Sequence, residues 1–181
     1  MKILVIESSP HKNSSSNLLA DHFIRGAREA GHKVNIFDAA RATLHPCLGC
    51  EVCGMSSSCC QKDDMTEEKE QILGADMVVF VTPLYYFGMS AQLKTLIDRF
   101  YSFNKQLSAK GLKTALIVAA WDNRDWTMQD ISSHYHTLCK YLNFKDQGMI
   151  LGFGCGTVSM TEKSSYPQKS YELGRSLKDR Q

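Results

Sequence analysis

The sequence predicts an α/β fold, a doubly wound parallel sheet of five strands. Short apolar runs suited to buried strands alternate with longer segments in which apolar residues recur at helical spacing. Polar, aromatic or glycine-rich loops follow several of these runs. Right-handed crossovers between parallel strands leave few topologies for such an alternation, and ligands of such sheets bind beyond the carboxyl ends of the strands.

The expected elements follow one another along the whole chain. The β-branched and aliphatic run from Ile3 to Ile6 begins the pattern, and Leu19, Phe23 and Ala27 then recur at helical spacing. The segment 39–65 shows little periodicity, so we expect a long loop there. Expected strands cover residues 3–6, 33–37, 75–81, 114–120 and 149–153, and expected helices cover 16–30, 66–73, 89–100, 126–142 and 171–179.

Size and charge narrow the class of protein. A chain of 181 residues is expected to form one domain, residues 1–181, with a substantial core. Lys plus Arg number 21 and Asp plus Glu number 19, and this near-balance gives no support to a nucleic-acid partner. No signal-peptide pattern and no apolar run of roughly 18 residues is found, so we expect a cytoplasmic chain without a membrane span.

The loop after the first expected strand predicts an anion site. From Glu7 to Asn17 the chain is polar and rich in serine, and an amphipathic helix follows it. The first N–H groups of that helix and the positive end of its dipole would face whatever lies in the loop. The alternative is an exposed polar turn with a helix cap, and the strand and helix on either side favour the site.

Two further strand ends carry aromatic residues. Tyr85, Tyr86 and Phe87 follow the strand that ends in Thr82-Pro83, and Trp121 follows the next one. Each could instead be a half-buried packing residue, as tryptophan often is at interfaces. A ligand with a phosphate at one end and a flat ring at the other would satisfy all three strand ends.

These loops resemble the NAD(P)H-dependent FMN reductase branch of the flavodoxin-like fold. The matching segments are Ser-Ser-Pro-His-Lys-Asn-Ser-Ser-Ser-Asn (8–17), Lys-Asp-Asp-Met (62–65), Thr-Pro-Leu-Tyr-Tyr-Phe-Gly (82–88) and Ser-Ala-Gln-Leu-Lys-Thr-Leu-Ile-Asp-Arg (90–99). The resemblance covers about the first 120 residues. It implies the strand order 2-1-3-4-5, with a cysteine-containing loop, 41–65, inserted after the second strand.

The resemblance also implies an FMN site. The family often has glycine where Ser8 stands and arginine where His11 stands, and histidine is a pH-dependent phosphate partner. The implied phosphate-binding residues are Ser9, His11, Ser14, Ser15, Ser16 and Asn17, and the implied residues around the flavin ring are Thr82, Pro83, Leu84, Tyr85, Tyr86, Phe87, Gly88, Ala120 and Trp121.

Five of the seven cysteines lie within fourteen residues, a clustering too local to staple a fold. Short spacings of this kind let one loop wrap a [4Fe–4S] cluster, and the spacing is similar to that of the iron–sulfur flavoproteins. The expected ligands are Cys47, Cys50, Cys53 and Cys59, with Cys60 as a substitute for Cys59. The alternatives are free or redox-labile thiols and, less in keeping with the spacing, zinc.

The resemblance implies an enzyme that takes a hydride from NAD(P)H onto FMN and passes electrons to a quinone, a flavin or another acceptor. No side chain is nominated as a proton-transfer catalyst. A one-electron carrier that relays electrons between redox proteins through FMN and a [4Fe–4S] cluster is the alternative, and a binding module without cofactor is a third. We also expect a homodimer, because the aromatic loop 85–87 would need covering.

Overall fold

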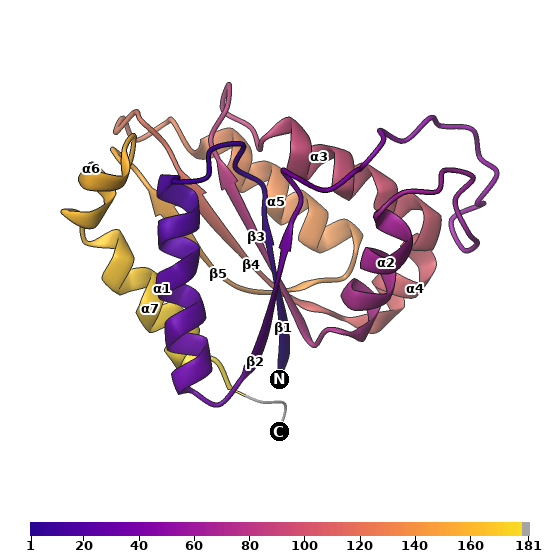
Figure 1. The fold of residues 1–181 in the computed structure, drawn as a ribbon, viewed down its shortest axis with the longest axis horizontal. Helices are drawn as coiled ribbons and strands as arrows, with labels where there is room; N and C mark the ends of the chain where they lie inside the picture. The colour runs from indigo at the N-terminus through magenta and orange to yellow at the C-terminus, as the bar shows by residue number, and fades with distance from the viewer. Residues whose placement is uncertain (179–181) are drawn as a thin grey trace.

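The computed structural model describes residues 1–178 and shows a central sheet between two layers of helices (Figure 1). Helices α1 and α7 cover one face, and α2, α3, α4 and α5 lie on the other side. The strands are β1 (Lys2–Glu7), β2 (Lys33–Asp38), β3 (Met77–Pro83), β4 (Lys113–Ala119) and β5 (Lys145–Gly152). The helices are α1 (Ser15–Glu29), α2 (Met65–Gly74), α3 (Ala91–Asp98), the 3-10 helix η1 (Arg99–Phe103), α4 (Asn104–Lys110), α5 (Gln129–Tyr141), α6 (Val158–Glu162) and α7 (Tyr166–Ser176).

The sheet has the order β2-β1-β3-β4-β5, and every neighbouring pair of strands is parallel. The predicted fold class and strand order are therefore confirmed. All five strands end at the same edge of the sheet, so the loops that follow them converge there.

Alternation along the strands divides the core into two clusters. Ile3 and Val5 of β1 pack with Leu19 and Phe23 of α1 on one face. The intervening β1 residues pack on the opposite face, in a cluster with residues of α3 and α5. The continuous apolar runs in the sequence are thus explained by burial of the strands on both faces.

The contact between α1 and α7 depends on two glycines. A methyl group at Gly26 would lie 2.1 Å from the carbonyl oxygen of Tyr171, and one at Gly174 would lie 2.2 Å from that of Phe23. Because neither distance can be tolerated, the close approach of the two helices requires glycine at both positions.

Several predicted boundaries are wrong. The expected helix 89–100 ends as an α-helix at Asp98 and continues as η1 and α4, and α6 was not predicted. Strand β5 begins at Lys145, four residues before the expected start, and α7 begins at Tyr166 rather than at residue 171. Residue 179, the expected end of the last helix, lies outside the described residues. Short helices such as α4 and α6 carry too few turns for a clear apolar period.

Helix α2 buries a carboxyl group. Glu68 is fully buried, and its Oε2 accepts a hydrogen bond from Nε2 of Gln71 at 3.1 Å, whereas Oε1 has no partner. Burial raises the pKa of Glu68 to about 8. The side chain is therefore an uncharged acid at neutral pH.

Among the described residues, no helix is both long and apolar enough to cross a membrane.

Candidate functional site

A cavity of about 410 Å³ opens at the carboxyl edge of the sheet. It lies where the loops after β1, β3, β4 and β5 meet, as the rule for doubly wound sheets predicts. Its size falls in the range of cofactor sites. The lining residues are Ser9, His11, Asn13, Ser14, Ser15, Ser16, Pro83, Leu84, Tyr85, Ala119, Trp121, Cys155, Gly156, Thr157 and Val158.

Hydroxyl groups at the start of α1 form one end of the cavity. Ser14 is the N-cap, and its Oγ accepts a hydrogen bond from the backbone N–H of Asn17 at 3.1 Å and lies 3.3 Å from Oγ of Ser16. The N–H groups of Ser15 and Ser16 are in the first turn, where no intrahelical acceptor is available. This end of the cavity can therefore bind an anion by hydrogen bonds and by the helix dipole.

A buried hydrogen-bond network joins the serine loop to the loop after β3. The Ser8 hydroxyl donates to the carbonyl of Val81 at 2.7 Å, and the Ser90 hydroxyl lies 2.9 Å from Oγ of Ser8. The backbone N–H of Ser90 in turn donates to Oγ1 of Thr82 at 2.9 Å. Ser8 and Thr82 thus hold two walls of the cavity together and are not in its lining.

Asn17 faces Glu7 instead of the cavity. Its Nδ2 donates to Oε2 of Glu7 at 3.0 Å, and its Oδ1 is buried without a partner. Burial, followed by the charges of Asp21 and Asp38, raises the pKa of Glu7 to about 7. The carboxyl group beneath the serine loop is therefore only partly ionised at neutral pH, which limits negative charge near an anion site.

The aromatic loop after β3 is a strained hairpin. Tyr85 and Gly88 pair through two backbone hydrogen bonds of 3.0 Å, and Tyr86 and Phe87 between them have φ of 46° and 64°. Bulky residues in this left-handed region cost about 1–3 kcal/mol each, a strain found most often at functional sites. Tyr85 lines the cavity, whereas the Tyr86 side chain is fully exposed.

Trp121 also lines the cavity and packs against the loop after β5. A methyl group at Gly156 would lie 2.2 Å from Cε3 of Trp121, so the indole ring packs directly on the glycine backbone. The backbone N–H of Gly154 donates to the carbonyl of Asp122 at 3.1 Å, which fixes the two loops together. Trp121 is 70% exposed, so its other surface is free to meet a ligand.

The cavity brings together nine of the fifteen residues predicted for the cofactor, and it leaves Asn17, Thr82, Tyr86, Phe87, Gly88 and Ala120 outside its lining. Ala120 is a core residue, and Ala119 lines the cavity in its place. Asn13, Ala119 and residues 155–158 also line the cavity and were not predicted. The signal for the last group was present, because the glycine-rich segment after the fifth strand ends at the same edge of the sheet.

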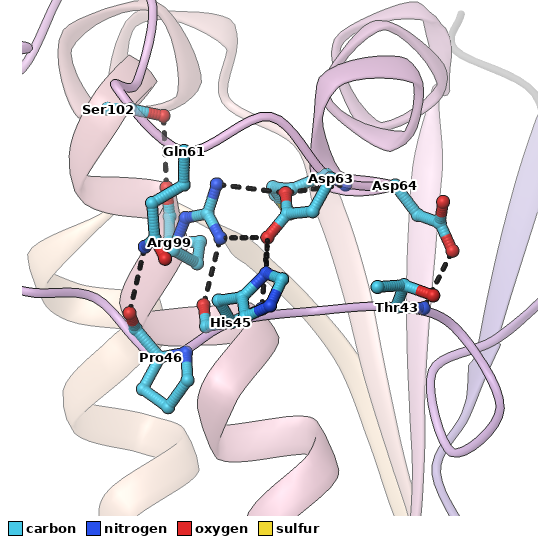
Figure 2. A network of polar contacts seen from close by, with 9 residues as sticks. Thr43, His45, Pro46, Gln61, Asp63, Asp64, Arg99 and Ser102 are labelled. Atoms are coloured by element: carbon cyan, nitrogen blue, oxygen red, sulfur yellow. Dashed lines mark hydrogen bonds and ion pairs between the residues drawn. The ribbon is translucent and has the colours of Figure 1, made fainter.

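The cysteine loop, residues 41–64, is held at its base by a buried ion pair (Figure 2). Both nitrogens of the Arg99 fork donate to Asp63, at 2.5 and 3.0 Å, and Nη1 also donates to the carbonyl of His45 at 2.8 Å. Gln61 Nε2 donates across the base to the carbonyl of Pro46 at 2.8 Å. The chain entering the loop and the chain leaving it are thus fastened to each other and to η1.

Charge at this base is balanced within the protein. Burial opposes the ionisation of Asp63, but hydrogen bonds from Arg99 and His45 hold its pKa at about 2. Burial likewise opposes the charge on Arg99, but Asp63 and then Cys59 raise its pKa overall. The Cys59 thiol lies beside Arg99, and the two line a pocket of about 90 Å³ with Lys62 and Lys69.

The five clustered cysteines differ in their exposure. Cys53 is buried against the protein, and Cys47 is exposed. Cys50 and Cys60 are exposed and face each other, with their sulfur atoms 3.5 Å apart. Within residues 1–178, no three Cys, His, Asp or Glu side chains are grouped so as to hold a metal ion. The loop as arranged does not fit a four-thiolate cluster, and the ligand set stays a prediction.

A larger, more open hollow of about 590 Å³ runs along α5 and β5 and includes His136, Lys140 and Phe153. It contains none of the predicted site residues, and we therefore place the functional site in the smaller cavity.

Several curated proteins are similar to this chain in sequence. An iron–sulfur flavoprotein of Archaeoglobus fulgidus is 26% identical over 155 residues, which are 85% of this chain and 69% of that protein. YwqN of Bacillus subtilis, a putative NAD(P)H-dependent FMN-containing oxidoreductase, is 26% identical over 167 residues, covering 85% of this chain and 86% of that one. Four further iron–sulfur flavoproteins, from A. fulgidus and Methanocaldococcus jannaschii, are 32–34% identical, but the matches span only about half of their length.

A solved structure supports the fold. The NAD(P)H:quinone oxidoreductase of Methanothermobacter marburgensis superposes with a TM-score of 0.77 at 22% identity, covering 100% of this chain and 98% of that one. The Flavodoxin_2 family, described by its flavodoxin-like fold, matches residues 1–173. With the strand order, the cavity at the carboxyl edge and this match in agreement, the chain belongs to the Flavodoxin_2 family.

Proposed function

We propose that the chain is an FMN-dependent oxidoreductase that uses NAD(P)H to reduce a quinone, a flavin or another small-molecule acceptor. The observation that carries the proposal is the cavity, which joins a hydroxyl-lined helix N-terminus to a gap between Tyr85 and Trp121. These ends suit the phosphate and the flat ring of FMN, respectively. The names of YwqN and of the M. marburgensis oxidoreductase point to the same chemistry.

The residues present fit the cofactor. Ser9, Ser14, Ser15 and Ser16 offer hydroxyl groups, and the start of α1 offers unpaired N–H groups and its dipole. No lysine or arginine is among the described lining residues, so these neutral donors and His11 would carry phosphate binding. When bound, FMN would supply two-electron chemistry between nicotinamide and acceptor.

The protein would contribute position and exclusion of water. Pro83 and Leu84 line the cavity with apolar surface, and Trp121, packed against Gly156, would keep the ring in a fixed plane. The exposed Tyr86 and Phe87 would meet the substrate or a second subunit. We propose a homodimer that covers this aromatic loop, which sedimentation at micromolar concentration would test: a monomeric mass would contradict it.

The direct test is reconstitution of the purified protein with FMN, followed by NADH and NADPH oxidation with a quinone as acceptor. We expect stoichiometric flavin absorbance and FMN-dependent consumption of the nicotinamide. Absence of bound flavin would overturn the proposal. Bound flavin that NADH and NADPH fail to reduce, but that a ferredoxin reduces, would favour the one-electron carrier suggested by the names of the iron–sulfur flavoproteins.

A further inference from the structure

The cysteine loop contains a thiol that the four-cysteine spacing leaves without a role. Cys60 lies outside the Cys47, Cys50, Cys53 and Cys59 pattern, yet its sulfur is 3.5 Å from that of Cys50. This is a direct contact between two exposed side chains ten residues apart.

The contact follows from how the loop is fastened. Gln61, the residue after Cys60, donates to the carbonyl of Pro46 (Figure 2). Beside this bond, Arg99 pairs with Asp63 and donates to the carbonyl of His45. The two chains therefore leave the base side by side, which brings the thiols on either chain within reach of each other.

Strained backbone flanks Cys50. Gly49 and Glu51, on either side of it, have φ of 62° and 59°. A non-glycine residue such as Glu51 rarely adopts this left-handed conformation unless its surroundings hold it there. Met55 and Lys105 fasten the far arm of the loop, through a backbone hydrogen bond of 3.2 Å from Lys105.

Two other thiols of the loop contact the protein. Cys53 is buried, and its carbonyl accepts a hydrogen bond from the Ser57 hydroxyl at 2.7 Å. Cys59 lines the small pocket beside Arg99 and Lys69. Cys59 also lies close enough to Cys60 for the two thiols to interact. Cys59, however, is half-buried beside Arg99, whereas Cys60 is exposed beside Cys50.

We propose that Cys50 and Cys60 form a redox-active pair that closes to a disulfide by exchange with a disulfide of low molecular weight. The distance between the sulfurs must shorten from 3.5 Å to about 2.05 Å, a movement that rotation of two exposed side chains can supply. Because the fastened base already holds the chains together, little loop entropy is lost on closure.

The exchange proceeds in two balanced steps. One cysteine, as its thiolate, attacks a sulfur of the small disulfide, forms a mixed disulfide and releases one small thiolate. The second cysteine, also as a thiolate, attacks the protein sulfur of that mixed disulfide, forms the Cys50–Cys60 bond and releases the other small thiolate. Two protein thiols lose two electrons, the small disulfide gains them, and the two protons pass through solvent to the released thiolates.

The test uses the full chain, reduced and then incubated with oxidised glutathione, followed by alkylation and peptide mapping by mass spectrometry. We expect one intramolecular disulfide, joining Cys50 to Cys60, while the buried Cys139 and Cys155 stay reduced. In Cys60→Ser, formation of an intramolecular disulfide should fall at least roughly tenfold and Cys50 should retain a glutathione adduct. The matched control Cys59→Ser should form the disulfide at about the wild-type rate.

Three results would overturn the proposal. One is a disulfide that joins other cysteines, and another is unchanged disulfide formation in Cys60→Ser. The third is anaerobically purified protein with stoichiometric iron and sulfide in which Cys50 resists alkylation, because a metal-bound Cys50 is not a partner for Cys60.

Discussion

The cavity at the carboxyl edge of the sheet and the cysteine loop are built on opposite principles. The cavity is assembled from the ends of four strands, and buried hydrogen bonds among Ser8, Thr82 and Ser90 join its walls. The cysteine loop has no regular secondary structure between Asp38 and Met65, and its base is fastened mainly by the Arg99–Asp63 pair.

Because of this difference, we expect the two regions to respond differently to single substitutions. The geometry of the cavity is distributed over the sheet and both core clusters, so no single polar contact defines it. The loop is fastened by a few polar contacts, of which the buried Arg99 guanidinium makes three. A substitution at the base should therefore alter the loop strongly and the cavity weakly, and a substitution in the cavity wall should do the reverse.

The largest effect is expected from Arg99→Met. Removing the guanidinium leaves the Asp63 carboxylate buried without its cation, a loss that costs about 3–5 kcal/mol of the free energy of unfolding. Urea denaturation measures this loss, and limited proteolysis should show cleavage within residues 43–64 before cleavage elsewhere.

The matched control is Lys94→Met, which breaks the exposed Lys94–Asp98 pair and should cost less than about 1 kcal/mol. Equal losses of stability in the two variants would contradict the role given to Arg99. A loop that resists protease in Arg99→Met would do so as well.

A smaller effect, confined to the cavity, is expected from Gly156→Ala. The added methyl group would collide with Trp121, and because that ring is 70% exposed it should swing outward rather than destabilise the core. We expect FMN affinity to fall roughly tenfold, equivalent to about 1.4 kcal/mol, with a change in tryptophan fluorescence. Gly74→Ala, where a methyl group meets nothing within 4 Å, is the control and should bind FMN normally.

An effect of similar size concerns Glu68 of α2, which begins where the cysteine loop ends. Its folded pKa of about 8 lies above its unfolded value of about 4.5. Between these values the folded state holds a proton that the unfolded state has released, so this group lowers stability progressively as pH rises from 4.5 to 8. Glu68→Gln should therefore stabilise the protein by on the order of 1–2 kcal/mol at pH 7.5 and have no such effect at pH 4.

Thermal or urea unfolding at the two pH values checks this prediction. A stabilisation by Glu68→Gln that is the same at pH 4 and pH 7.5 would show that the buried carboxyl is not the cause.

The cavity and the cysteine loop also differ in how much of each could be predicted from the sequence. The strand order and the cavity were predictable because apolar runs fix the strands, and parallel topology then fixes where the strand ends meet. The direction of individual side chains could not be predicted from the sequence. Thr82 forms a hydrogen bond with Ser90, and Asn17 forms one with Glu7, so neither side chain faces the cavity. In the cysteine loop, the spacing predicts Cys59 as the fourth ligand and assigns no contact to Cys60. The contact between Cys60 and Cys50 could not be predicted, because the base of the loop is held by Arg99, more than thirty residues away in the sequence.

We propose that the start of α1 binds the phosphate of FMN, and riboflavin, which lacks that phosphate, tests this proposal directly. Titration followed by flavin fluorescence should show FMN bound roughly a hundredfold more tightly, as two charge-assisted hydrogen bonds would give. Ser15→Asp places a carboxylate where the phosphate would lie, favourable for the helix itself, and should remove most of this preference. The neutral control Ser15→Asn should keep it within about threefold, whereas equal affinity of the wild-type protein for FMN and riboflavin would contradict the account.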